Sequence, residues 1–294
     1  MKSNIQLFLE HTAQSFLSLA KVVIQSKFRS PMPPKSKQNC IILANGPSLK
    51  DSLRQNPDAF DKEKYDLFCV NYFANTDFYE RLKPNYCVLI APEYWVEEFE
   101  DISTILQKRT QLFENIEAKT DWEMTILIPW EAKKSKAWKE LFKNKPNIHI
   151  QYFNRTPVEG CTSINHFLFK HRLGMPRPHN VLLPSIWLTI NMHYQNIYLV
   201  GSDHSWLPEI SVNDQNEVLI NQKHFYDDTT SVPKPMRKAT GKRKLYEVLE
   251  KFMLAFKGYF ILNKYAKTKG VKIWNSTPNS FIDAFERKEI VKEP

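Results

Sequence analysis

The run CIILANGPSLKD at residues 40–51 contains the residue types best suited to binding a ligand. Its four apolar residues show no alternation, which predicts a strand buried on both faces. Gly46 then permits a tight turn, and Pro47 cannot continue a central strand. Ser48 is placed to cap a helix that begins one residue later, and the free N–H groups at such a helix start suit a phosphate. The same residue types also form strand-to-helix turns that bind nothing, so this run alone leaves both interpretations open.

Comparable residues follow the ends of several other apolar runs. In chain order they are Asn45 and Gly46, then Asn71, then Asp203 and His204, and finally Ser276. An asparagine amide both donates and accepts hydrogen bonds, as a base or ribose requires, and glycine lets the backbone approach a phosphate. The alternative is that these residues are ordinary loop formers. Their recurrence favours a nucleotide pocket assembled from strand ends.

The elements that would position these residues alternate along the chain. Strands are expected at residues 40–44, 67–70, 87–90, 124–129, 148–153, 197–200 and 271–274, and helices at 93–113, 181–193, 243–268 and 280–289. Such alternation predicts an α/β fold: a Rossmann-like, open, mostly parallel sheet flanked by helices. Ligands bind such sheets outside the carboxyl ends of the strands. We expect one catalytic domain at residues 38–294, with a lid segment at about residues 205–240.

The N-terminal segment, residues 1–37, is expected to form an amphipathic helix and a linker. Apolar residues between positions 4 and 28 gather on one side of a helix, and Lys21, Lys27 and Arg29 follow. The segment has no uninterrupted apolar run of transmembrane length and no signal-peptide pattern. It therefore predicts a helix that lies on a membrane surface, on a second subunit in a homo-oligomer, or on its own domain.

Composition narrows the class of protein further. The formal net charge of +9 suggests an acidic partner, and the basic run at residues 234–244 accompanies no nucleic-acid-binding module. We expect an anionic substrate or an anionic membrane surface as partner and no nucleic acid. The four cysteines, Cys40, Cys69, Cys87 and Cys161, have no metal-ligand spacing, which indicates a reducing, cytoplasmic setting without disulfides.

The short motifs IILANGPSLK, FCVNYF, NIYLVGSD and TPNSFIDAF, in this order, resemble the bacterial family 42 sialyltransferases. They are also similar to the neighbouring 6-hydroxymethylpterin diphosphokinases. The sialyltransferase resemblance implies transfer of sialic acid or a related keto-sugar from a CMP-linked donor to a surface-glycan acceptor. It also implies a place in lipopolysaccharide or capsule biosynthesis and inversion at the anomeric carbon. The excess of basic residues fits a position peripheral at the inner membrane, where lysines interact with anionic lipid.

Residue roles follow from the same resemblance. It implies that Asn45, Gly46, Pro47 and Ser48 meet the nucleotide and that Asn71 lies near the ribose or base. Within NQKHFYDD at residues 221–228 it makes His224 the general base and Tyr226 a phosphate ligand.

His204 is the main alternative base, because it follows Asp203 at a strand end and a base needs a pKa near neutrality. The sequence departs from the family at three places. Ala44 stands where the family has glycine, and Ala91 where it has asparagine. A family arginine has no secure counterpart, and Arg177 is the nearest residue to it. These departures put the identity of the sugar nucleotide in question.

The resemblance requires no cofactor and no metal. Asp203, Asp227 and Asp228 could nevertheless ligate Mg²⁺, although Asp227 and Asp228 fit a solvated turn better. A diphosphokinase would need Asp203 and Asp227 to hold the metal with ATP. The second alternative is a nucleotide-binding protein without catalytic activity.

Overall fold

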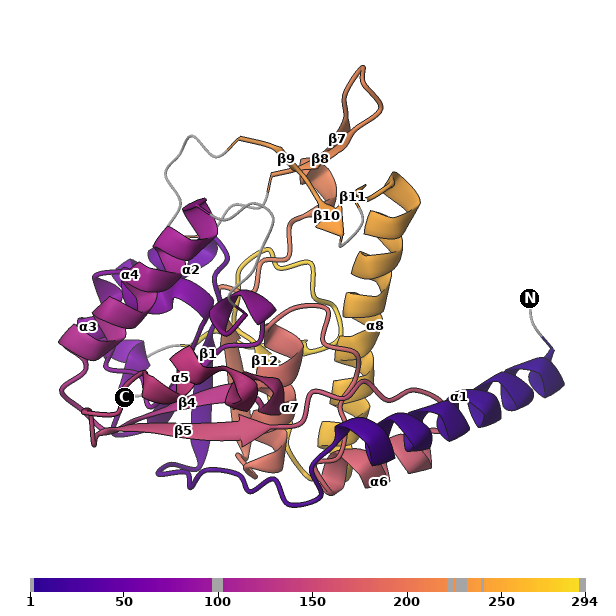
Figure 1. Ribbon diagram of the computed structural model, residues 1–294, viewed down its shortest axis with the longest axis horizontal. Helices are drawn as coiled ribbons and strands as arrows, with labels where there is room; N and C mark the ends of the chain where they lie inside the picture. Colours follow the sequence, from indigo (N-terminus) through magenta and orange to yellow (C-terminus); the bar gives the residue numbers. More distant parts are fainter. Residues whose placement is uncertain (1–2, 97–102, 222–224, 226–231, 239–240, 291–294) are drawn as a thin grey trace.

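A computed structural model describes residues 3–96, 103–221, 225, 232–238 and 241–290 (Figure 1). Its centre is an eight-stranded parallel sheet in the order β13-β12-β6-β1-β2-β3-β4-β5. The strands are β1 (Asn39–Leu43), β2 (Tyr65–Val70), β3 (Tyr86–Val88), β4 (Met124–Pro129), β5 (Ile148–Phe153), β6 (Asn196–Val200), β12 (Lys272–Asn275) and β13 (Glu286–Arg287). The predicted α/β, Rossmann-like fold is confirmed.

Helices cover both faces of the sheet. They are α1 (Asn4–Gln25), α2 (Ser48–Gln55), α3 (Phe78–Leu82), α4 (Ser103–Lys119), α5 (Lys136–Glu140), α6 (Thr162–Lys170), α7 (Leu182–Asn191) and α8 (Leu245–Thr268). Alternate residues of β1 point to opposite faces of the sheet. Ile42 packs in the same core cluster as Trp187 of α7, and Ile41 packs in the same cluster as Leu49 of α2. This two-sided burial is why the central strands are continuous apolar runs.

Two of the predicted helices differ from the structure. Residues 280–289 form no helix; the parallel edge strand β13 lies there instead. The Ser280 hydroxyl donates to the Ser202 carbonyl at 2.6 Å, and the Asn275 amide donates to the Ile282 carbonyl at 2.9 Å. These bonds hold the chain in an extended course beside the sheet. At residues 93–113, a short 3₁₀ turn, Pro92–Tyr94, and α4 replace one long helix.

The segment at residues 205–240 includes short antiparallel strands. They are β7 (Ile210–Val212), β8 (Val218–Ile220), β9 (Lys234–Pro235) and β10 (Arg237–Lys238), which pairs with β11 (Gly241–Lys242). Val218 and Ile220 pack with Val248 and Phe252 of α8 in a small apolar cluster of their own. The segment is therefore anchored to the N-terminal half of α8, as Figure 1 shows. Its predicted function as a lid stays a prediction.

Candidate functional site

A cavity of about 760 Å³ opens at the carboxyl ends of the central strands. Residues that follow β1, β2, β3, β5 and β6 line it, together with residues just before α7 and one residue of α8. The chain runs from β1 through β2 to β5 on one side and crosses to β6 on the other, so the strand order reverses between β1 and β6. Parallel sheets bind their ligands at this reversal. The cavity lies at the strand ends, where the sequence predicts a nucleotide pocket, and nucleotide binding there stays a prediction.

The turn after β1 is held against the end of β6. The Gly46 N–H donates to the Gly201 carbonyl at 2.7 Å. A Cβ at position 46 would overlap Asp203 Oδ2 and lie 2.5 Å from the Gly201 carbonyl oxygen. Glycine is therefore required here for close approach, and Gly46 and Pro47 both line the cavity.

The start of α2 already has an anionic partner within the protein. The Ser48 N–H donates to Asp203 Oδ1 at 3.2 Å, and the Ser48 hydroxyl donates to Asp203 Oδ2 at 2.8 Å. The prediction that Ser48 caps this helix is wrong, because α2 begins at Ser48 itself. The carboxylate of Asp203 accepts a hydrogen bond from the free N–H of Ser48. Burial raises the pKa of Asp203, and the hydrogen bonds from Ser48 oppose that rise. We expect any bound phosphate to find its positive charge elsewhere in the cavity.

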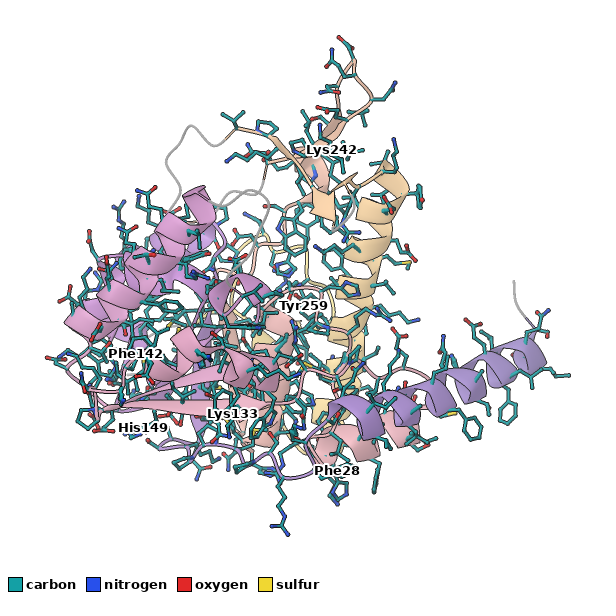
Figure 2. All side chains as sticks on the ribbon, in the orientation of Figure 1. Phe28, Lys133, Phe142, His149, Lys242 and Tyr259 are labelled. Atoms are coloured by element: carbon teal, nitrogen blue, oxygen red, sulfur yellow. The ribbon has the colours of Figure 1, made fainter. Side chains whose placement is uncertain are left out.

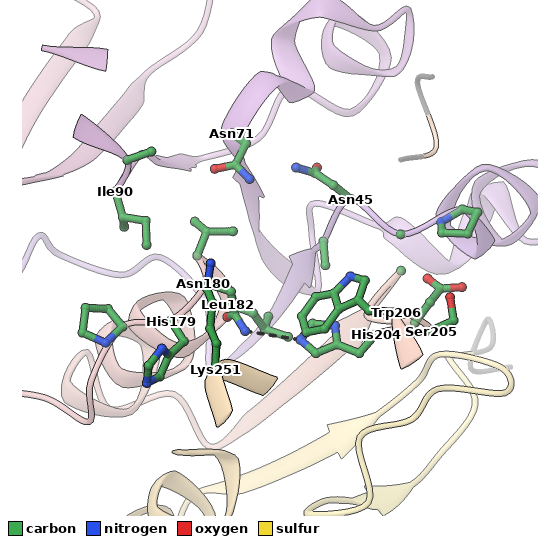
Figure 3. A pocket seen from close by; sticks show the side chains of 18 of the residues that line it. Asn45, Asn71, Ile90, His179, Asn180, Leu182, His204, Ser205, Trp206 and Lys251 are labelled. Carbon is green, nitrogen blue, oxygen red and sulfur yellow. Dashed lines mark hydrogen bonds between the residues drawn. The ribbon is translucent and has the colours of Figure 1, made fainter. Parts of the chain in front are cut away.

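Asn45 has the least satisfied polar side chain of the site. It is 8% exposed, and neither its amide nitrogen nor its amide oxygen has a hydrogen-bond partner among the described residues. In Figure 3 the side chains of Asn45 and Asn71 point toward one another on one side of the cavity. Asn71 adopts a positive φ of 53° at the end of β2 and accepts a long hydrogen bond, 3.4 Å, from the Tyr94 hydroxyl. A buried amide without partners costs free energy, so such a group at a cavity wall indicates a ligand.

His204 belongs to a buried hydrogen-bond network on another wall. Its Nε2 lies 2.5 Å from the Tyr259 hydroxyl, and the Asn180 amide nitrogen donates to that hydroxyl at 2.9 Å. The ring of Trp206 lies against His204, with centroids 4.0 Å apart (Figure 3). Burial lowers the pKa of His204 to about 3, so the imidazole is neutral at pH 7. A neutral ring this weakly basic is better suited to positioning a ligand than to removing a proton.

The basic side chains that line the cavity are not among the site residues predicted from the sequence. Lys251 reaches from α8 into the cavity in Figure 3, and His179 and Arg155 line the same space. Burial is the largest cause that lowers the pKa of Lys251, followed by the charge of Arg243. Arg155 Nε donates to Glu131 at 2.7 Å, whereas no described carboxylate lies within ion-pair distance of Lys251. Nothing in the helical pattern distinguishes Lys251 from the other lysines of α8; only the packing of that helix over the sheet places it here.

The remaining predicted site residues divide into two groups. Ser276 follows β12, on the far side of β6 from β1, and is absent from the lining of the 760 Å³ cavity. His224 and Tyr226 lie outside the described residues, as do Asp227 and Asp228. Among the described residues, no group of three or more histidine, cysteine, aspartate or glutamate side chains could hold a metal ion.

Comparison of the chain with models of known protein families gives no match, and comparison with curated proteins gives none either. The functional argument therefore depends on the geometry of the cavity.

Proposed function

We propose that this protein is a glycosyltransferase that uses a nucleotide-linked sugar, with a CMP-linked keto-sugar such as sialic acid as donor and a surface glycan as acceptor. The observation that carries the proposal is the buried amide of Asn45, which has no partner among the described residues, at the reversal point of a parallel sheet. The motif resemblance supports the choice of nucleotide and sugar. The proposed setting is cytoplasmic.

The nucleoside would meet the two asparagines. The amide of Asn45 can donate one hydrogen bond and accept another, which matches a base or ribose that does both. Asn71 lies in the same wall, and its amide nitrogen is a second donor. Apolar side chains of Ile90 and Leu182 line the cavity too and offer contact area for a ring.

The phosphate would meet Lys251. Its ammonium group projects into the cavity and has no carboxylate partner among the described residues, and a partly buried charge interacts strongly with an anion. Departure of CMP would leave negative charge on this phosphate, and a fixed cation stabilises such charge without a metal ion. Removal of the acceptor proton stays with His224, as the resemblance implies, while His204, which is held by the Tyr259 hydroxyl, positions the sugar.

Thermal stabilisation by nucleotides tests the proposal. The purified protein is heated with CMP, UMP, GDP or ATP, each with and without Mg²⁺. A ligand at a hundred times its dissociation constant adds about 2.7 kcal/mol, or roughly 5 °C in a chain of this size. We expect a shift with CMP that is independent of Mg²⁺. A shift only with ATP and Mg²⁺ would replace the proposal with the diphosphokinase alternative.

Two variants test whether CMP binds in this cavity and not elsewhere on the protein. Lys251→Met should abolish the CMP shift, because the phosphate loses its cation. Lys257→Met is the matched control: it removes an exposed lysine of the same helix that does not line this cavity. If CMP binds and neither CMP-sugars nor acceptors react, the protein is a nucleotide-binding protein without transferase activity.

A further inference from the structure

The helix α1 has an unusual distribution of side chains. The face that packs on the protein consists of small side chains: its buried residues are Ser15, Ser18 and Val22. The Ser18 hydroxyl donates to the Glu159 carbonyl at 2.9 Å and accepts from the Glu159 N–H at 2.8 Å. Hydrogen bonds of Ser18 and the burial of Val22 in the main core cluster hold the helix to the body, and most of the apolar residues of α1 are not used for that purpose.

A neighbouring face of α1 is apolar and exposed. Its residues include Ile5 at 73% exposure, Phe8 at 67%, Leu9 at 60%, Phe16 at 69% and Val23 at 69%. Their offsets of 3, 4, 11 and 18 from Ile5 place them on one side of an α-helix. Figure 1 shows the N-terminal half of α1 projecting beyond the rest of the molecule. A continuous apolar face of this kind requires a partner.

The surroundings of this face are basic. Between residues 3 and 29 the chain has three basic side chains, Lys21, Lys27 and Arg29, and one acidic side chain, Glu10. Lys27 and Arg29 are exposed on either side of Phe28, which is itself 67% exposed just beyond the end of α1 (Figure 2). An aromatic ring between two cations suits the boundary between lipid headgroups and acyl chains.

We infer that the apolar face of α1 docks on an anionic lipid bilayer, with the helix lying in the plane of the membrane surface. No described helix is long and apolar enough to span a bilayer, so α1 lies on the surface and does not cross it. A second copy of this chain is the competing occupant. It would bring the same net charge of +9 to the contact, whereas anionic headgroups complement that charge. The inference does not depend on the proposed activity.

Co-sedimentation of the full chain with lipid vesicles tests the inference. The vesicles consist of phosphatidylcholine alone or with about 30% phosphatidylglycerol, at low salt and at 0.5 M NaCl. We expect binding to the anionic vesicles that weakens at least several-fold at high salt. The double variant Phe8→Gln/Phe16→Gln should lower the partition coefficient by about a hundredfold, since each buried apolar side chain contributes roughly tenfold or more.

A matched control distinguishes this face from exposed apolar residues in general. Met253→Gln/Phe260→Gln removes two exposed apolar side chains from α8 and should leave vesicle binding unchanged. Far-UV circular dichroism and the melting temperature establish that both double variants are folded. Equal loss in both variants, or absence of binding to anionic vesicles, would overturn the inference. So would a dimer, measured by light scattering, that only the α1 variant dissociates while vesicle binding is absent.

Discussion

Replacing Asn45 by alanine should make the free protein more stable, although the residue is 92% buried. Its amide oxygen and amide nitrogen are both buried without partners among the described residues, and each such group costs about 1–3 kcal/mol. Truncation removes both costs and sacrifices some packing of the side chain, which offsets about 1 kcal/mol. The free energy of unfolding should therefore rise by about 1–5 kcal/mol, and the melting temperature by roughly 2–8 °C.

Asn154 provides a matched control for this prediction. It is 2% exposed and also follows a parallel strand, but its side chain is fully paired. It accepts from the Lys27 N–H and donates to the Lys27 and Arg172 carbonyls, each at 2.8 Å. Asn154→Ala removes three hydrogen bonds and leaves backbone groups unpaired, so it should lower the free energy of unfolding by roughly 3–5 kcal/mol.

The assay is urea unfolding of the three proteins, followed by thermal melts with CMP. Asn45→Ala should be more stable than the wild type and should lose most of the CMP shift. A fall of more than about 1 kcal/mol in this variant would show that the Asn45 amide has partners in the folded protein. That result would refute the argument that the amide is reserved for a ligand.

Three further predictions concern the same cavity. Gly46→Ala should lower the free energy of unfolding by roughly 3 kcal/mol, because the new Cβ overlaps the Asp203 carboxylate. In an Asp203→Ala background the same change should cost less, since that carboxylate is gone. If urea unfolding shows that the two substitutions have additive effects, the prediction is contradicted. As pH falls below the ordinary histidine value of about 6.5, the unfolded chain takes up a proton that buried His204, with its pKa of about 3, does not. Stability should therefore fall by about 1.4 kcal/mol per pH unit between pH 6 and 4 through this residue, and a His204→Phe variant with the same slope in urea unfolding would disprove it. Tyr259→Phe removes the hydroxyl shared by His204 and Asn180 and should cost about 1–3 kcal/mol in the same measurement, whereas no loss would mean that the network does not stabilise the fold.

The sequence located most of the sheet because local patterns are sufficient for that purpose. Every apolar run expected to be a strand is one, and the fold class follows from their alternation with helices. The helix expected at residues 280–289 was wrong because hydrogen bonds to the end of β6, distant in sequence, hold that segment extended. The exposed apolar face of α1 is visible in the spacing, but its exposure depends on which face packs on the body.

For the cavity, the sequence by itself determined which residue types stand at the strand ends, since strands, turns and their glycines have local signals. Only the tertiary structure decided which of them have partners. Asp203 accepts from Ser48 across 155 residues of sequence, while Asn45, three residues before Ser48, has no partner for its amide in the described part of the chain. Strand order likewise separates Ser276 from the cavity, and helix packing brings Lys251 into it. Hydrogen bonds and charges act over a few ångströms, so their partners are set by the packing of elements that no local pattern specifies.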